Sequence, residues 1–153
     1  MKSTKLQSKF KVLIKQLKNL NYKKYYFENN LKKFLNVNKF KKIEFEPNCI
    51  IDNYNKKYEP QILDLIRVHF ITKFMKVITV LEFGCGNSSI FISDALKKNK
   101  HKFQNFVKKN LRKYNLFELH SVDSNLKYVK STQKKLKKYN FDKISKIFFS
   151  KSI

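Results

Sequence analysis

Apolar residues near the N-terminus recur at helical spacing. Between residues 3 and 20 they follow one another at steps of four, three, four and three, with lysines among the intervening positions: Leu6, Phe10, Leu13, Leu17 and Leu20. This pattern predicts an amphipathic helix with a narrow apolar face. Two uses of that face are open: a membrane surface, or packing on its own domain or a second copy. We favour packing.

A second helix is predicted over residues 22–42. Its apolar positions are mostly aromatic: Tyr22, Tyr25, Tyr26, Phe27, Leu31, Phe34 and Leu35. Aromatic rings interleaved with lysines can stack on nucleic-acid bases, but helical spacing favours rings that pack in a core. We therefore expect residues 1–45 to form a helical N-terminal extension. Residues 46–59 are polar, contain Pro47 and have no period, which predicts a linker.

From residue 60 onward the pattern alternates between helices and strands. Pro60 lies at the start of a predicted helix whose apolar positions are Ile62, Leu63, Leu65, Ile66, Phe70 and Phe74. Strands are predicted at 77–83, 116–123 and 144–149, because these runs are apolar, β-branched or alternating. Helices are predicted from near Ser88 and after the second strand, where Asp123 or Ser124 can serve as the N-cap.

The order strand–helix–strand–helix–strand predicts an α/β fold class. It indicates a partial Rossmann-like parallel sheet with right-handed connections and the spatial order third, second, first strand. The predicted domain spans residues 60–153. Residues 97–115, rich in lysine and asparagine, lengthen the first connection. We interpret them as a basic insertion made of an elongated helix end and a loop.

The two glycines of the chain, Gly84 and Gly86, both lie where the first strand must turn into a helix. Glycine is used where φ is positive or where a ligand approaches the backbone closely. A strand, a Gly-x-Gly turn and a helix N-terminus direct backbone N–H groups and the helix dipole at one point. This stretch therefore predicts a site for a nucleotide-type ligand.

Two acids belong to the same predicted site, Glu82 before the glycines and Asp123 at the end of the second strand. In a mononucleotide-binding half, the carboxylate after the second strand accepts hydrogen bonds from a ribose diol. A nicotinamide dinucleotide site has a third glycine, and that position is Ser89 here, which disfavours a dinucleotide.

Residues 81–88, Leu-Glu-Phe-Gly-Cys-Gly-Asn-Ser, resemble the first motif of class I S-adenosylmethionine-dependent methyltransferases. The resemblance covers roughly residues 60–150 and implies S-adenosylmethionine as cofactor and methyl transfer as reaction. It places the following residues against the methionine part of the cofactor: Glu82, Phe83, Gly84, Cys85, Gly86 and Asn87. It assigns Asp123 to the ribose hydroxyls. The adjacent Ser88 and Ser124 complete the predicted cofactor-binding set.

The sequence departs from that family in three ways. Ser88 stands where a third glycine is frequent, and the interval from Gly86 to Asp123 is long for such a unit. The family fold continues into a fourth strand with substrate and catalytic contacts, whereas this sequence stops after the third. We therefore expect a fragment or a truncated reading frame, and neither the catalytic residues nor the methyl acceptor can be predicted. Without a fourth strand, the strand at 77–83 exposes an edge that predicts self-association unless another segment covers it.

The charge of the chain is strongly positive, with 35 basic and 11 acidic residues and a formal net charge of +24. Only Arg67 and Arg112 are arginines, although the planar arginine fork is preferred for reading phosphates and bases. Abundant lysine together with asparagine, isoleucine and tyrosine is typical of A/T-rich coding sequence. We therefore favour solvated lysine faces, and keep a non-catalytic nucleic-acid-binding protein as the second hypothesis.

The remaining reactive residues carry little signal. Cys49 and Cys85 form no disulfide framework, which predicts a reducing, cytoplasmic location. No apolar run has the length of a signal peptide or of a membrane span of about 18 residues. The three histidines lack metal-ligand spacing, so no metal site is predicted. Asp94 and Glu118 have no paired acid–base partner in the sequence.

Overall fold

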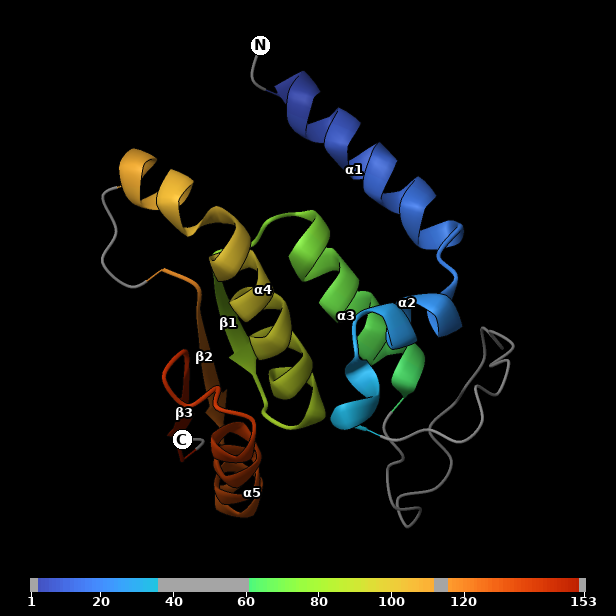
Figure 1. Ribbon diagram of the computed structural model, residues 1–153. Helices are drawn as coiled ribbons and strands as arrows, with labels where there is room; N and C mark the ends of the chain where they lie inside the picture. The colour runs from blue at the N-terminus through green and yellow to red at the C-terminus, as the bar shows by residue number, and fades with distance from the viewer. Residues whose placement is uncertain (1–2, 36–60, 112–115, 152–153) are drawn as a thin grey trace.

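The computed structural model describes residues 3–35, 61–111 and 116–151, with side chains from residue 7 onward. The elements follow in this order (Figure 1): α1 (Ser3–Lys18), α2 (Tyr22–Glu28), the short 3₁₀ helix η1 (Leu31–Lys33), α3 (Ile62–Phe74), β1 (Thr79–Phe83), α4 (Asn87–Asn110), β2 (Glu118–Asp123), α5 (Leu126–Lys138) and β3 (Ser145–Phe149). The predicted linker at 46–59 and Cys49 lie outside the described residues.

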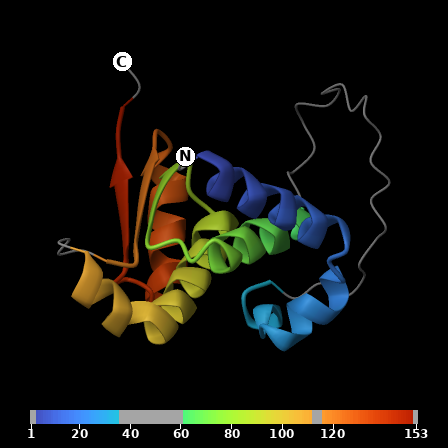
Figure 2. The ribbon, with the colours of Figure 1, turned by 90° about the horizontal axis from the view of Figure 1, so that it is seen from above.

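The three strands form one parallel sheet in the order β1-β2-β3. Thr79 of β1 lies opposite Glu118 of β2, and Leu119 of β2 lies opposite Ser145 of β3. The predicted α/β class and the order third, second, first are therefore confirmed for these strands. Figure 2 shows the strands gathered at one side of the molecule and α2 at the other.

Helices cover one face of the sheet. Val80 and Leu119 from β1 and β2 pack against Ile92 and Leu96 of α4. The alternation of side chains along β1 directs Leu81 and Phe83 to the opposite face, where they are 61% and 82% exposed. In the described part of the chain, β1 pairs with β2 only.

Most of the predicted N-terminal aromatic residues pack in or against the core, as we favoured, but Phe27 is 52% exposed. Tyr26 and Leu31 share a hydrophobic cluster with Ile66 of α3 and Phe91 of α4. The single helix predicted over residues 22–42 is wrong, because α2 ends at Glu28 and η1 follows. The side chain of Asn29 donates to the backbone oxygen of Tyr25, 2.9 Å away, and Asn30 adopts a left-handed conformation. Asparagine competes in this way for helical carbonyls and ends the helix. Residues 36–42 lie outside the described ranges.

The first helix occupies the predicted range and lies alongside α3 (Figures 1 and 2). Leu13 is buried, whereas Phe10, Val12 and Ile14 are about half exposed. Only part of the apolar surface of α1 is therefore packed against the rest of the described chain.

Other boundaries differ from the prediction. The N-cap of α3 is Gln61, and Pro60 lies outside the described residues. The helix α4 runs unbroken to Asn110, which agrees with the predicted elongated helix end, and residues 112–115 of the predicted loop lie outside the described residues.

The predicted N-cap of α5 is wrong. Asn125, rather than Asp123 or Ser124, accepts hydrogen bonds from the first-turn N–H groups of Lys127 and Tyr128, at 3.0 and 3.4 Å. The carboxylate of Asp123 instead accepts from the N–H of Asn125.

Candidate functional site

The glycine turn begins directly after β1. Gly84 has a φ of +87°, in the left-handed region that glycine adopts without strain. Its N–H donates to the backbone oxygen of Val122 on β2, 2.8 Å away. The chain therefore leaves β1 sharply while the turn stays bound to β2.

Asp123 ties the turn to the end of β2. Its Oδ2 accepts from the N–H of Cys85 at 2.8 Å, and its Oδ1 accepts from the N–H of Asn125 at 2.7 Å. These hydrogen bonds lower the pKa of Asp123 and favour the carboxylate. The hydrogen bond from Asn125 has the larger effect and that from Cys85 the smaller. The structure thus brings together the two predicted parts of the site, the glycine turn and the acid after the second strand.

Glu82 is bound to three serine hydroxyls. Ser88 Oγ donates to its Oε1, and Ser89 Oγ and Ser121 Oγ donate to its Oε2, all at 2.6 Å. Ser89 Oγ also accepts from the N–H of Gly86 at 3.0 Å. The carboxylate of Glu82 therefore connects β1, β2 and the first turn of α4, and acts on the loop through Ser89. Sequence reasoning missed Ser89 and Ser121 as parts of the site.

Gly86 has a different environment from Gly84. Its φ of 165° is extended, and no heavy atom beyond its chain neighbours lies within 4 Å of the position that a Cβ would take. The packing among the described residues does not require a glycine here. The space above the Gly86 backbone is open to a ligand.

The other predicted site residues lie around the turn. The amide oxygen of Asn87 accepts from Lys135 Nζ of α5 at 3.0 Å, and Ser124 is exposed beside Asp123. Phe83 lies on the face of the sheet away from α4, so it does not join Glu82. Burial is the main cause that raises the pKa of the Cys85 thiol, which fits a small residue that fills the turn better than a thiolate nucleophile.

A buried polar network lies between α2, α3 and α4. Tyr25 Oη donates to Nδ1 of His69 at 2.9 Å, and Nε2 of His69 donates to Oδ2 of Asp94 at 3.0 Å. Burial lowers the pKa of His69 to about 4, although Asp94 opposes the shift, so the imidazole is neutral and its tautomer is fixed by these two partners. Burial and the charge of Asp94 raise the pKa of Tyr25, which keeps its hydroxyl a donor. The network holds α2 against the α/β unit.

Asp94 has three charged or hydrogen-bonding partners among the residues that the structure describes. Besides His69 it binds Lys98 at 2.5 Å and Lys33 at 3.5 Å. Burial alone would raise the pKa of Asp94, but the hydrogen bonds from His69 and Lys98 outweigh it and lower the pKa to about 2. The absence of a partner for Asp94 in the sequence was therefore misleading.

Glu118 also has a histidine partner that the sequence did not indicate. Its Oε2 lies 3.0 Å from Nε2 of His120 and 3.3 Å from Nζ of Lys146. For the pair of His69 and Asp94, the sequence does hold a signal, because each is a polar residue at an apolar position of a helix.

Comparison of this chain with family models, with curated proteins and with solved structures finds no match. No helix in the described ranges combines the length and the apolar character that crossing a membrane requires.

Proposed function

We propose that the turn from Gly84 to Asn87, together with Asp123, binds S-adenosylmethionine, and that the chain is the cofactor-binding part of a methyltransferase with a Rossmann-like sheet. The observation that carries the proposal is Gly86. A chain with two glycines places one of them at a helix N-terminus where no described atom occupies the space that a side chain would take. Close approach of a ligand to the backbone explains that choice.

The surroundings of Gly86 support a nucleotide-type ligand. The turn lies at the carboxyl end of a parallel sheet and leads into the N-terminus of α4, where unpaired N–H groups and the helix dipole attract electron-rich groups. Asp123 favours its charged form and accepts one N–H on each oxygen and a further hydrogen bond from the Cys85 thiol, which leaves lone-pair capacity for a ribose hydroxyl.

The residues of this chain would act by positioning the cofactor. The bound cofactor supplies a sulfonium methyl group, and its transfer depends mainly on orientation and exclusion of water. Glu82 holds Ser88 and Ser89 at the start of α4, and through Ser89 it fixes the N–H of Gly86. The proposal assigns neither a catalytic residue nor the methyl acceptor.

A nicotinamide dinucleotide fits the same turn less well. The position of the third glycine holds Ser89, which is fully buried and whose hydroxyl bonds both Glu82 and Gly86. In the dinucleotide fingerprint the third glycine allows the helix to pack closely on the strand, and here the Ser89 hydroxyl and its hydrogen bonds occupy that contact.

Calorimetric titration of the full chain with S-adenosylhomocysteine, with NAD as the comparison ligand, tests the proposal. We expect selective binding of S-adenosylhomocysteine. We also expect Gly86→Val to abolish binding while the chain still unfolds in one cooperative transition, because the added side chain fills the open space and meets no described atom. Unchanged binding by Gly86→Val, or no binding by a folded wild-type chain, would contradict the proposal.

A further inference from the structure

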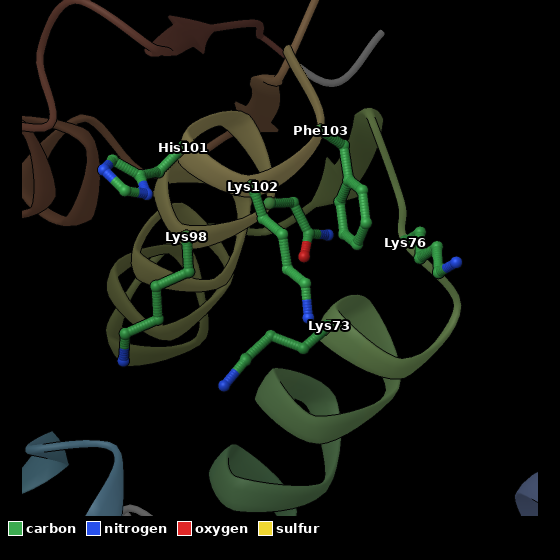
Figure 3. A pocket seen from close by; sticks show the side chains of 7 residues that line it. Lys73, Lys76, Lys98, His101, Lys102 and Phe103 are labelled. Atoms are coloured by element: carbon green, nitrogen blue, oxygen red, sulfur yellow. The ribbon is translucent and has the colours of Figure 1, made fainter. Parts of the chain in front are cut away.

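A basic hollow lies at the other end of the α3–α4 pair. It has a volume of about 480 Å³ and is lined by Lys73 and Lys76 at the end of α3 and by Lys98, Lys102 and Phe103 of α4. Figure 3 shows Lys73, Lys98 and Lys102 extending into the space between the two helices. No carboxylate lines this hollow.

The helix end itself does not require these lysines. Cations are often found near helix C-termini, where carbonyl oxygens lack partners. Here the buried side-chain amide of Asn99 donates to the backbone oxygens of Thr72 and Val77, at 2.9 and 3.0 Å. A neutral amide therefore satisfies one carbonyl in the last turn of α3 and one just beyond it, and neither carbonyl depends on a lysine side chain.

The lysines of the hollow carry an excess of positive charge. Lys98 is paired with Asp94, and Lys73 Nζ donates to the neutral amide oxygen of Asn29. No ion pair joins Lys73, Lys76 or Lys102 to a carboxylate among the described residues. The pKa of Lys73 is lowered first by burial and second by the positive charge of Lys98. The ammonium groups of Lys73 and Lys98 therefore repel each other. A bound anion would relieve this repulsion.

Lys76 has a left-handed backbone conformation, which favours glycine. Its φ is 56°, its N–H donates to the oxygen of Lys73, and the N–H of Val77 donates to the oxygen of Thr72. These paired bonds define the helix C-terminal motif that favours glycine at this residue. A lysine with a left-handed backbone carries a conformational cost. A lysine at an ordinary exposed position has no such cost, so coding bias alone does not account for Lys76.

The basic surface continues along α4. Two further hollows share His101 with the first. They add five lysines, Lys33, Lys97, Lys100, Lys138 and Lys143, against two carboxylates, Asp94 and Asp142. Such a length of surface suits an extended polyanion better than a single phosphate. Phe106 lies one helical turn beyond Lys102 and is 70% exposed, which gives a ring on which a base can stack.

We propose that this hollow binds the phosphodiester backbone of a single-stranded nucleic acid, with Lys73, Lys76 and Lys102 contacting phosphates and Phe106 stacking on a base. Lysine acts as a point charge without the arginine fork, so the binding tracks the backbone and does not read sequence. Lys98 lies 12 residues along the helix from Gly86, or roughly 18 Å. The inference does not depend on the cofactor proposal.

The test measures fluorescence anisotropy of a labelled oligouridylate of about 15 nucleotides with the full chain. The test variant replaces Lys73, Lys76 and Lys102 by glutamine. The matched control replaces three exposed lysines of α5 by glutamine and removes the same charge: Lys127, Lys130 and Lys134. We expect the test variant to lose at least about tenfold more affinity than the control. We also expect it to lower the slope of log affinity against log salt by about 2.

Phe106→Ala provides a second readout that leaves the charge and the buried core unchanged. We expect roughly a fivefold or larger loss of affinity, since a stacked ring contributes to binding of each base. Equal losses in the two lysine variants, or no loss in Phe106→Ala, would overturn the proposal. Tighter binding of the wild-type chain to vesicles of anionic phospholipid than to the oligonucleotide would overturn it as well, because the surface would then belong to a membrane.

Discussion

The two ends of α4 have opposite polar chemistry. At the N-terminal end, Glu82 is matched by three hydroxyls and Asp123 by two backbone N–H groups. Toward the other end, four lysines line a hollow that faces one carboxylate, Asp94. At the first end every carboxylate is hydrogen-bonded within the protein, and we call this the matched end. At the second end the lysines outnumber the carboxylates, and we call this the unmatched end, because a bound anion would balance its charge. One helix thus carries a preorganised turn and a charged surface.

The largest expected effect concerns the junction between the two ends, where His69 neighbours Asp94. The folded chain keeps His69 neutral down to about pH 4, whereas an ordinary histidine is protonated below about pH 6.5. As the pH falls through this window, the unfolded chain takes up a proton that the folded chain does not. The free energy of unfolding should therefore fall by on the order of 3 kcal/mol. Urea denaturation across this pH range measures it.

His69→Gln is the matched variant for that measurement. The glutamine amide can donate to Asp94 and accept from Tyr25, so it replaces both hydrogen bonds without a titrating group. We expect the fall in stability between pH 6.5 and 4 to disappear in this variant. A variant with the same pH dependence as the wild type would show that the acid sensitivity arises elsewhere.

The next effect breaks the matched end. Glu82→Ala leaves Ser88, Ser89 and Ser121 without their common acceptor, and we expect a loss of about 2 kcal/mol in the free energy of unfolding. Chemical denaturation measures it. Glu28→Ala is the control, because Glu28 is exposed and forms an i,i+4 pair with Lys24, so its loss should be about 0.5 kcal/mol or less. Equal losses in both variants would show that Glu82 does not organise the turn.

The smallest expected effect concerns the lysine hollow, and it is a gain in stability rather than a loss. Lys76→Gly removes the left-handed strain, and we expect the chain to become more stable by about 1 kcal/mol while it binds the oligonucleotide more weakly. Asn140 holds the same position after α5, with a φ of 57°, but asparagine tolerates this conformation. Asn140→Gly should therefore change stability little. The melting temperatures of both variants test this prediction. A lower melting temperature for Lys76→Gly than for the wild type would show that Lys76 is not strained.

Much of the fold was predictable because it follows from periodicity. The strands, their order and the amphipathic α1 came from the spacing of apolar residues alone. Helix ends were less predictable, since Asp123, Ser124 and Asn125 are all competent caps and only the geometry of the turn selects Asn125. The break after Glu28 was missed because asparagine can either continue or end a helix.

The site was predictable only in its local part. The glycines and Asp123 are recognised from the residues themselves, and the structure places them together. The hydroxyls around Glu82 come from β2 as well as from α4, and His69 lies 25 residues before Asp94. Such pairs depend on how helices and strands cross, which one sequence does not reveal. The lysine hollow likewise appears only when α3 and α4 lie side by side.

Gly86 has a consequence for how natural variants of this chain should be interpreted. Gly84 is needed by the backbone, so its replacement affects folding, whereas replacement of Gly86 meets no described atom. On the proposed function, selection for a stable fold acts on Gly84 and selection for the ligand acts on Gly86, two residues apart. A natural variant with Gly84 intact and a bulky residue at position 86 would mark a lineage that kept the fold and gave up the ligand.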